Sequence, residues 1–173
     1  MSYCIEQTKD QTAEAFAVLK RTDLDEVRLV ASSTVCRINR RFDRLGSCVF
    51  AIDFSSEHVQ AQESEVGALT RFTFKMSEDD DESKPSLIEI VVSFEAAYTI
   101  LEAGFAPTDS QLEAFRRGNA IFNCWPYFRE YVHGTFARMG FPPPPVPFLR
   151  LIPKREDKPL VDSAKDARNQ VAQ

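Results

Sequence analysis

The sequence predicts an α+β fold: a short N-terminal helix, a four-stranded antiparallel sheet, and a long broken helix after the strands. Two patterns carry this prediction. Apolar and polar residues alternate along 68–76 and 87–101, which is the period of strands with one buried and one wet face. Between 111 and 139 apolar residues instead recur at spacings of three and four, the period of an amphipathic helix.

The other elements are predicted from local patterns in chain order. An amphipathic helix is expected over 12–19. A first strand over about 27–39 switches the register of its apolar residues, which predicts either a bulge near 32–34 or a strand that is apolar on both faces. A second strand is expected over 47–54, and a charged hairpin loop should join the strand at 68–76 to the strand at 87–101.

The long helix has clear ends and an expected interruption. Thr108 precedes it as a capping residue, and Gly140 fits its C-terminal cap. Gly118 weakens the helix and Pro126 lacks an amide proton, so the sequence predicts a discontinuity between them, either a new helix starting at Pro126 or a kink. The proline-rich run 142–147 should then form a polyproline II brace along the body.

One face of the long helix is a stripe of large apolar residues. The stripe comprises Ile121, Trp125, Phe128, Val132 and Phe136. It has more apolar area than one small sheet is expected to cover, and the chain contains 14 phenylalanines. The sequence therefore predicts an oligomer in which the long helices pack at the subunit interface.

Composition limits the class of protein. The 173 residues are 43% hydrophobic, which predicts one domain over 1–153, and the polar tail 154–173 is expected to be disordered. A net charge of -5 argues against nucleic-acid binding. No run is long enough to cross a membrane and no secretory signal is evident, so a cytoplasmic protein is expected.

Residues typical of metal or redox chemistry are sparse. The cysteines Cys4, Cys36, Cys48 and Cys124 lack CxxC spacing and are expected to be buried free thiols. The histidines, His58 and His133, have no neighbouring base or ligand, and no phosphate loop or nucleophile elbow occurs. The sequence predicts no cofactor, no metal and no enzyme. A hot-dog thioesterase, with Asp109 near a helix N-terminus, is the catalytic alternative.

At 123–131 the residues carry a family resemblance. The motif Pro-Tyr-x-Arg-Glu, at Pro126, Tyr127, Arg129 and Glu130, resembles the helix segment of SecB-type export chaperones. The order of strands, helix and proline segment is similar too, so the resemblance covers about 24–152. The run 24–29 is closer to the SecB-like chaperones that accompany toxin–antitoxin pairs. The family's second long C-terminal helix is not evident here.

The resemblance implies a function and a set of partners. It implies a homotetramer, a dimer of dimers, that acts as a holdase: it binds nonnative polypeptide without nucleotide, for export or to protect an antitoxin. The translocase ATPase SecA is an implied partner, although the family's acidic SecA-binding positions have no residue-by-residue match here. The client-binding residues are expected in the crossover, the helix and the proline segment. They are Phe42, Leu45, Trp125, Phe128, Phe141, Val146, Phe148 and Leu149.

Overall fold

The structure is a computed structural model that describes residues 3–39, 47–79 and 83–154. In chain order its elements are β1 (Tyr3–Gln7), α1 (Lys9–Leu19), β2 (Thr22–Cys36), β3 (Val49–Ala61), β4 (Glu65–Ser77), β5 (Ile88–Ile100), α2 (Asp109–Phe115), the π-helical turn η1 (Arg116–Ala120), α3 (Ile121–Arg138) and β6 (Leu149–Pro153). The predicted tail at 155–173 lies outside the described residues, and so do the predicted site residues Phe42 and Leu45.

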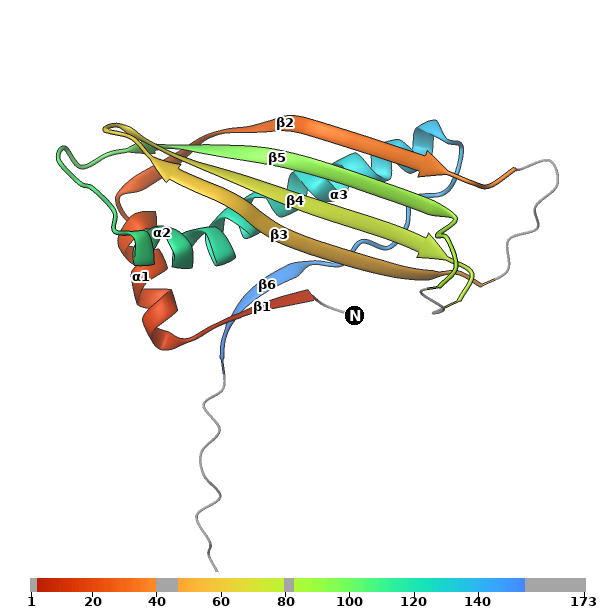
Figure 1. Ribbon diagram of the computed structural model, residues 1–173, viewed down its shortest axis with the longest axis horizontal. Helices are drawn as coiled ribbons and strands as arrows, with labels where there is room; N and C mark the ends of the chain where they lie inside the picture. The colour runs from red at the N-terminus through yellow and green to blue at the C-terminus, as the bar shows by residue number, and fades with distance from the viewer. Residues whose placement is uncertain (1–2, 40–46, 80–82, 155–173) are drawn as a thin grey trace, which may run out of the picture.

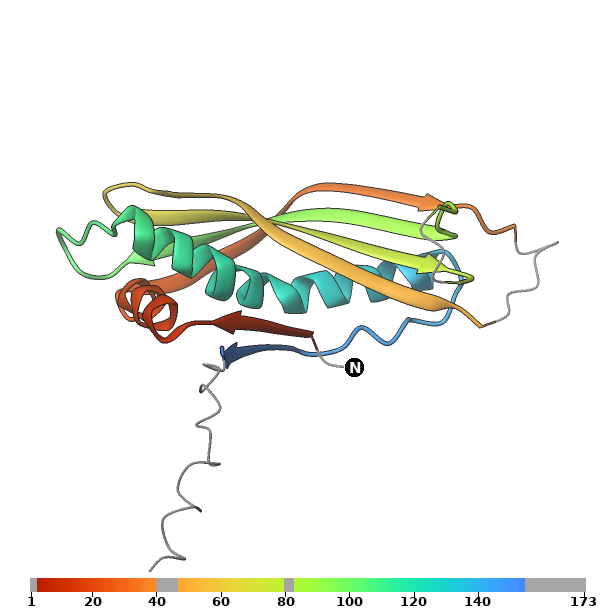
Figure 2. The ribbon, with the colours of Figure 1, turned by 60° about the horizontal axis from the view of Figure 1, so that its bottom comes forward.

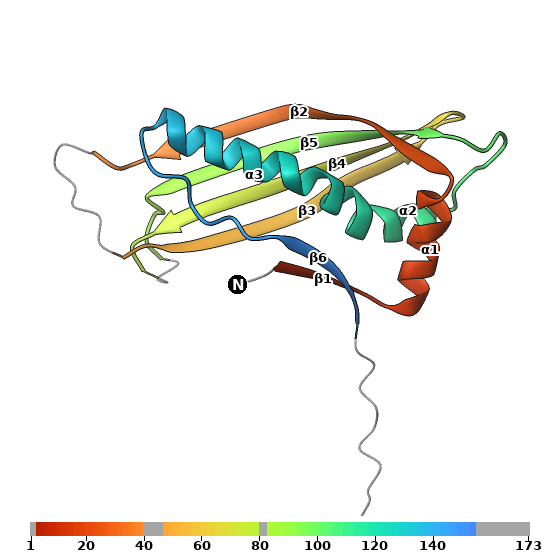
Figure 3. The ribbon, with the colours of Figure 1, turned by 180° about the vertical axis from the view of Figure 1, so that it is seen from behind.

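The main sheet has the strand order β2-β5-β4-β3, and every neighbouring pair is antiparallel. Alternate residues of β4 and β5 face one side and pair across the ladder, as Phe72 does with Val92 and Phe74 with Ile90. These four side chains are almost fully buried. The helix formed by α2, η1 and α3 crosses this face; it lies behind the sheet in Figure 1 and in front of it in Figure 3. The predicted α+β class and antiparallel sheet are therefore confirmed.

The edge strand β2 starts earlier than predicted, at Thr22, and carries two irregularities. The pairing with β5 shifts between Leu24 and Glu26 and again between Leu29 and Ala31. The second shift lies just before the predicted bulge at 32–34. Because of the extra residue, the even-numbered positions after it, such as Cys36, lie on the same face of the sheet as Leu29 before it. This explains why the apolar residues switch from odd to even positions in the sequence.

A two-stranded parallel ribbon, β1 with β6, was not predicted. Tyr3 pairs with Leu149 and Ile5 with Leu151, while the main sheet contains neither strand. Figure 2 shows this ribbon as a separate layer on the helix side of the main sheet. The prediction of a single four-stranded sheet was wrong in this respect. The two ribbon strands are short and far apart in the sequence, so no local pattern reveals their pairing.

Both helical units begin with a capping box, in which the side chains of the cap residue and of the third helical residue each accept a hydrogen bond from the other's backbone N–H. Thr8 pairs in this way with Gln11, and Thr108 pairs with Gln111. The expected discontinuity appears as the π-helical turn η1. Pro126, however, lies inside α3, so the alternative in which a new helix begins at Pro126 was wrong. Gly140 has a φ of 75° at the helix end, as its predicted capping role requires.

The apolar stripe on α3 is covered by the chain's own sheet. Its five side chains are exposed by 5% or less: Ile121, Trp125, Phe128, Val132 and Phe136. The argument that this stripe exceeds what one sheet can cover was therefore wrong, because four long strands and the ribbon together enclose it. Any interface between subunits must use other residues.

Two further sequence expectations are settled by exposure and length. Cys124 is buried and Cys48 is half-buried, but Cys4 and Cys36 are exposed, so the expectation of four buried thiols was wrong. Within the described ranges, no helix is both long enough and apolar enough to cross a membrane.

Candidate functional site

An aromatic cluster lies where α3 crosses the sheet, and it contains two of the predicted site residues. The cluster comprises Phe54 of β3, Phe72 of β4, and Trp125 and Phe128 of α3. Phe72 and Phe128 stack with ring centroids 4.7 Å apart, and Trp125 lies edge-on to Phe54 at 5.6 Å. Trp125 is 3% exposed and Phe128 is fully buried. As the structure stands, both residues form core and do not meet solvent.

The proline segment lies along α3 and is held there by three polar contacts. Trp125 Nε1 donates to the carbonyl of Pro147 at 3.0 Å, Arg129 Nε donates to the carbonyl of Val146 at 3.1 Å, and His133 Nε2 lies 3.0 Å from the carbonyl of Pro144. A proline-rich segment has few backbone donors, so its carbonyls are satisfied here by helix side chains. The segment is thereby fixed as a brace against the helix.

Among the predicted site residues that the structure describes, the side chains divide by exposure. Val146 and Leu149 are 4% and 6% exposed, and Phe141 is half-buried against Phe136, with ring centroids 6.4 Å apart. Phe148 is 71% exposed. The Arg129 guanidinium lies 4.5 Å from the Phe148 ring centroid, which orients an otherwise open ring by a cation–π contact.

A groove of about 250 Å³ lies between α1, η1 and β6, and the sequence analysis did not identify it. Its lining is mostly apolar: Gln7, Thr12, Ala15, Phe16, Leu19, Asn119, Leu151, Ile152 and Pro153. Phe16 is 58% exposed and Leu19 38% exposed at its rim. We call it the α1–β6 groove. A sequence signal existed, since Phe16 and Leu19 share a face of the predicted helix, but their partner β6 was unforeseen.

A second apolar surface lies along the other side of α3, beside β2. Leu24 and Leu29 are 41% and 47% exposed, and they pair across the ladder with Tyr98 and Phe94. Tyr127 of α3, 44% exposed, lies over Phe94 with ring centroids 6.3 Å apart. The helix covers β5 here but leaves the inner face of β2 open.

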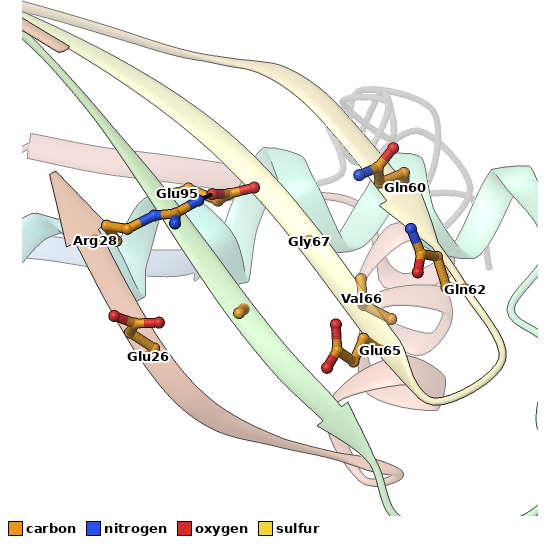
Figure 4. A pocket seen from close by; sticks show the side chains of 9 residues that line it. Glu26, Arg28, Gln60, Gln62, Glu65, Val66, Gly67 and Glu95 are labelled. Atoms are coloured by element: carbon orange, nitrogen blue, oxygen red, sulfur yellow. Dashed lines mark hydrogen bonds and ion pairs between the residues drawn. The ribbon is translucent and has the colours of Figure 1, made fainter. Parts of the chain in front are cut away.

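The wet face of the sheet carries a shallow polar pocket (Figure 4). Arg28 and Glu95 form an ion pair across β2 and β5, and Glu26, Glu65, Gln60 and Gln62 surround them. The hydrogen bond that the Arg28 guanidinium donates to the Glu95 carboxylate raises the pKa of Arg28 above its usual value. These are solvated charges, and exposed pairs of this kind contribute little to stability.

Groups suited to catalysis are not assembled in the described part of the chain. Burial raises the pKa of the Cys124 thiol to about 12, so it stays protonated and is a poor nucleophile. Asp109 is exposed in a shallow groove with Glu57, Glu113 and Arg116. Within residues 3–39, 47–79 and 83–154, no three His, Cys, Asp or Glu side chains gather as a metal site.

Comparison with solved structures gives a clear likeness in fold. The Mycobacterium tuberculosis Rv1957 SecB-like chaperone, solved with a ChAD peptide from the Rv1956 HigA1 antitoxin, superposes with a TM-score of 0.68 at 19% sequence identity. The match covers 81% of this chain and 99% of that chain. The protein has a SecB-like fold. The resemblance carried by the motif at 126–130 is thus confirmed at the level of fold.

Other comparisons add little. No known protein family and no curated protein matches the sequence. A protein of unknown function from Streptococcus agalactiae aligns over 73% of this chain and 97% of that chain, at 8% identity and a TM-score of 0.39, too weak to indicate a shared fold. The thioesterase alternative is not favoured, because the fold matched is SecB-like.

Proposed function

We propose that the protein is an ATP-independent holdase chaperone of the cytoplasm that binds nonnative polypeptide, with an antitoxin as its client. One observation carries this proposal: a solved protein that shares this fold is a SecB-like chaperone holding an antitoxin peptide. A holdase needs no chemical step, because binding lowers the free concentration of the unfolded chain and so delays aggregation.

The surface that we assign to the client lies along β6. Phe148 stands open immediately before this strand, and the residues at its far end line the α1–β6 groove. At about 3.3 Å per residue, the groove residues Leu151 to Pro153 lie roughly 10–17 Å along the strand from Phe148. An extended client segment can therefore place one apolar side chain against Phe148 and another in the groove. Open apolar area of this kind is typical of binding surfaces.

We also propose the homotetramer, assembled as a dimer of dimers through the outer face of α3 and the β2 side of the sheet. The exposed apolar residues support this assignment: Phe122 and Tyr127 on α3, and Leu24 and Leu29 on β2. An edge strand with exposed apolar residues is a liability in a monomer, since its free backbone groups can pair with other chains. Light scattering should give the mass of four chains, and a stable monomer at micromolar concentration would contradict the assembly.

The proposed activity is tested by diluting a chemically denatured protein into buffer that contains this protein and no nucleotide. We expect light scattering from aggregates to fall at near-stoichiometric ratios, with no effect of added ATP. Unchanged aggregation at tenfold excess would refute the holdase proposal. A toxin–antitoxin pair beside the gene would support the antitoxin as dedicated client, and coexpression with that antitoxin should then raise its soluble yield.

A further inference from the structure

Tyr3 of β1 fills a slot between the aromatic cluster and the free edge of the main sheet. Its ring centroid lies 5.9 Å from that of Trp125 and 6.4 Å from that of Phe54. Its hydroxyl accepts a hydrogen bond of 3.2 Å from the backbone N–H of Ile52. Tyr3 is therefore the side chain that separates the cluster from the outside at this edge.

The edge that Tyr3 closes is that of β3, the last strand of the sheet. The outward amides of β3 meet side chains there and not another strand. The N–H of Ile52 donates to Tyr3 Oη, and the N–H of Phe54 donates to Asp53 Oδ1 at 2.9 Å. An edge that is capped only by side chains can accept the backbone of an added strand once those side chains move.

The strand that carries Tyr3 is held to the body by three side chains. Tyr3 is at one end, Ile5 packs against the core, and at the other end Gln7 Nε2 donates to the carbonyl of Ala114 at 3.1 Å. Cys4 and Glu6 are exposed, and among the described residues β1 pairs only with β6. Two-stranded parallel pairing is weak by itself, so β1 is released by breaking this ladder and these three side-chain contacts.

We propose that Tyr3 is an autoinhibitory contact: it occupies the slot that an aromatic side chain of an extended client takes when β1 moves away. The proposal rests on the holdase function and deepens it. The client ring replaces the Tyr3 ring against Trp125 and Phe54, and a client carbonyl replaces the Tyr3 hydroxyl at the N–H of Ile52. The client supplies one aromatic ring and one hydrogen-bond acceptor in place of those that Tyr3 withdraws, which keeps the free-energy cost of opening low. Trp125 then contacts client although it is buried in the closed protein.

Substitution of Tyr3 tests the competition directly. The apparent Kd equals the intrinsic Kd divided by the fraction of open molecules, so a slot open in about a tenth of molecules weakens binding about tenfold. Tyr3→Ala should therefore bind reduced, carboxymethylated α-lactalbumin about tenfold more tightly than the wild type. Tyr3→Phe keeps the ring and loses the hydroxyl, so its affinity should fall between the two. Equal or weaker binding by a folded Tyr3→Ala protein would overturn the proposal.

Opening can also be measured without a client, because Trp125 is the single tryptophan of the chain. At 3% exposure it should resist quenching by acrylamide in the wild type. Tyr3→Ala should raise the quenching constant severalfold, and a folded Tyr3→Ala protein in which Trp125 stays protected would contradict the proposed slot.

A reversible lock covers the case in which Tyr3→Ala fails to fold. A Cβ on Gly118 would come within 2.9 Å of Gln7 Cδ, so cysteines at these two positions are neighbours. Gln7→Cys with Gly118→Cys, in a background of Cys4→Ser and Cys36→Ser, should tether β1 to the helix when oxidised. We expect the oxidised protein to lose most of its affinity for the unfolded probe and to recover it on reduction.

The outcomes separate this proposal from the holdase function. If the wild type does not bind the unfolded probe under any condition, the proposed function fails. If the wild type binds but the oxidised and reduced lock bind equally well, only the autoinhibitory contact fails. Tighter binding by Tyr3→Ala together with redox-dependent binding by the lock would support both.

Discussion

Replacing Phe148 with serine should weaken client binding while leaving the fold intact. The ring is 71% exposed, so its loss should change the free energy of unfolding by no more than about 0.5 kcal/mol. Complete burial of a phenylalanine side chain is worth about 1.5–3 kcal/mol. With 71% of the ring left for a client to cover, about 1–2 kcal/mol of binding free energy is at stake. That corresponds to a roughly 5- to 30-fold rise in Kd.

The neighbouring residue provides the matched control. Leu149 is 6% exposed, so Leu149→Ser should lower the free energy of unfolding by about 2–5 kcal/mol through loss of core packing. Chemical denaturation gives both stabilities, and fluorescence anisotropy of a labelled unfolded probe gives both values of Kd. If Phe148→Ser keeps its stability and also binds the probe with unchanged Kd, Phe148 is not part of the client surface.

Three further outcomes can be checked with purified protein. Pro126→Ala should raise the melting temperature, because restoring the amide inside α3 removes a penalty of up to about 3 kcal/mol; an unchanged or lower value would contradict this. A thiol reagent at pH 8 should label the exposed Cys4 within minutes and Cys124 only after unfolding, since burial keeps the Cys124 pKa at about 12. Gly118→Ala should destabilise the protein, and Gln7→Ala should largely remove that effect.

The long strands were predictable because their pattern is local. In β4 and β5 every second residue is apolar over most of the strand, and nothing but a half-buried strand has that period. The second strand was predicted to end at 54, whereas β3 extends to Ala61. Its continuation is polar and contains a register shift between Ser56 and His58, so alternation fails there although the backbone pairing continues.

The site was less predictable, for a different physical reason. Periodicity shows that one face of a helix is apolar, but it does not show whether the chain's own sheet or another chain covers that face. The sequence pattern around Trp125 and Phe128 is therefore the same whether these residues belong to the core or to a client-binding surface. Phe148 and Leu149 were predicted together for the client surface because a rigid proline segment precedes them. Phe148 is exposed and Leu149 is buried, and the pairing of Leu149 with β1 was not foreseen.

Gly118 shows how a local feature of the sequence depends on a distant contact. A glycine inside a helix costs about 1 kcal/mol relative to alanine, and the sequence alone suggests only that it weakens the helix. In the structure a Cβ at this position would lie 2.4 Å from Gln7 Nε2, so glycine leaves the space that the Gln7 side chain of β1 occupies beside the helix.

A double-mutant cycle separates these two roles of the glycine. If it serves the contact with β1, Gly118→Ala should cost about 1–3 kcal/mol in the wild type through overpacking and the lost Gln7 hydrogen bond. In a Gln7→Ala background the same substitution should be neutral or stabilising, because only the helix propensity of alanine remains. The coupling free energy would then be about 1–3 kcal/mol. Additive costs would instead show that the glycine serves the π-helical turn itself, and that the docking of β1 is independent of the shape of the helix.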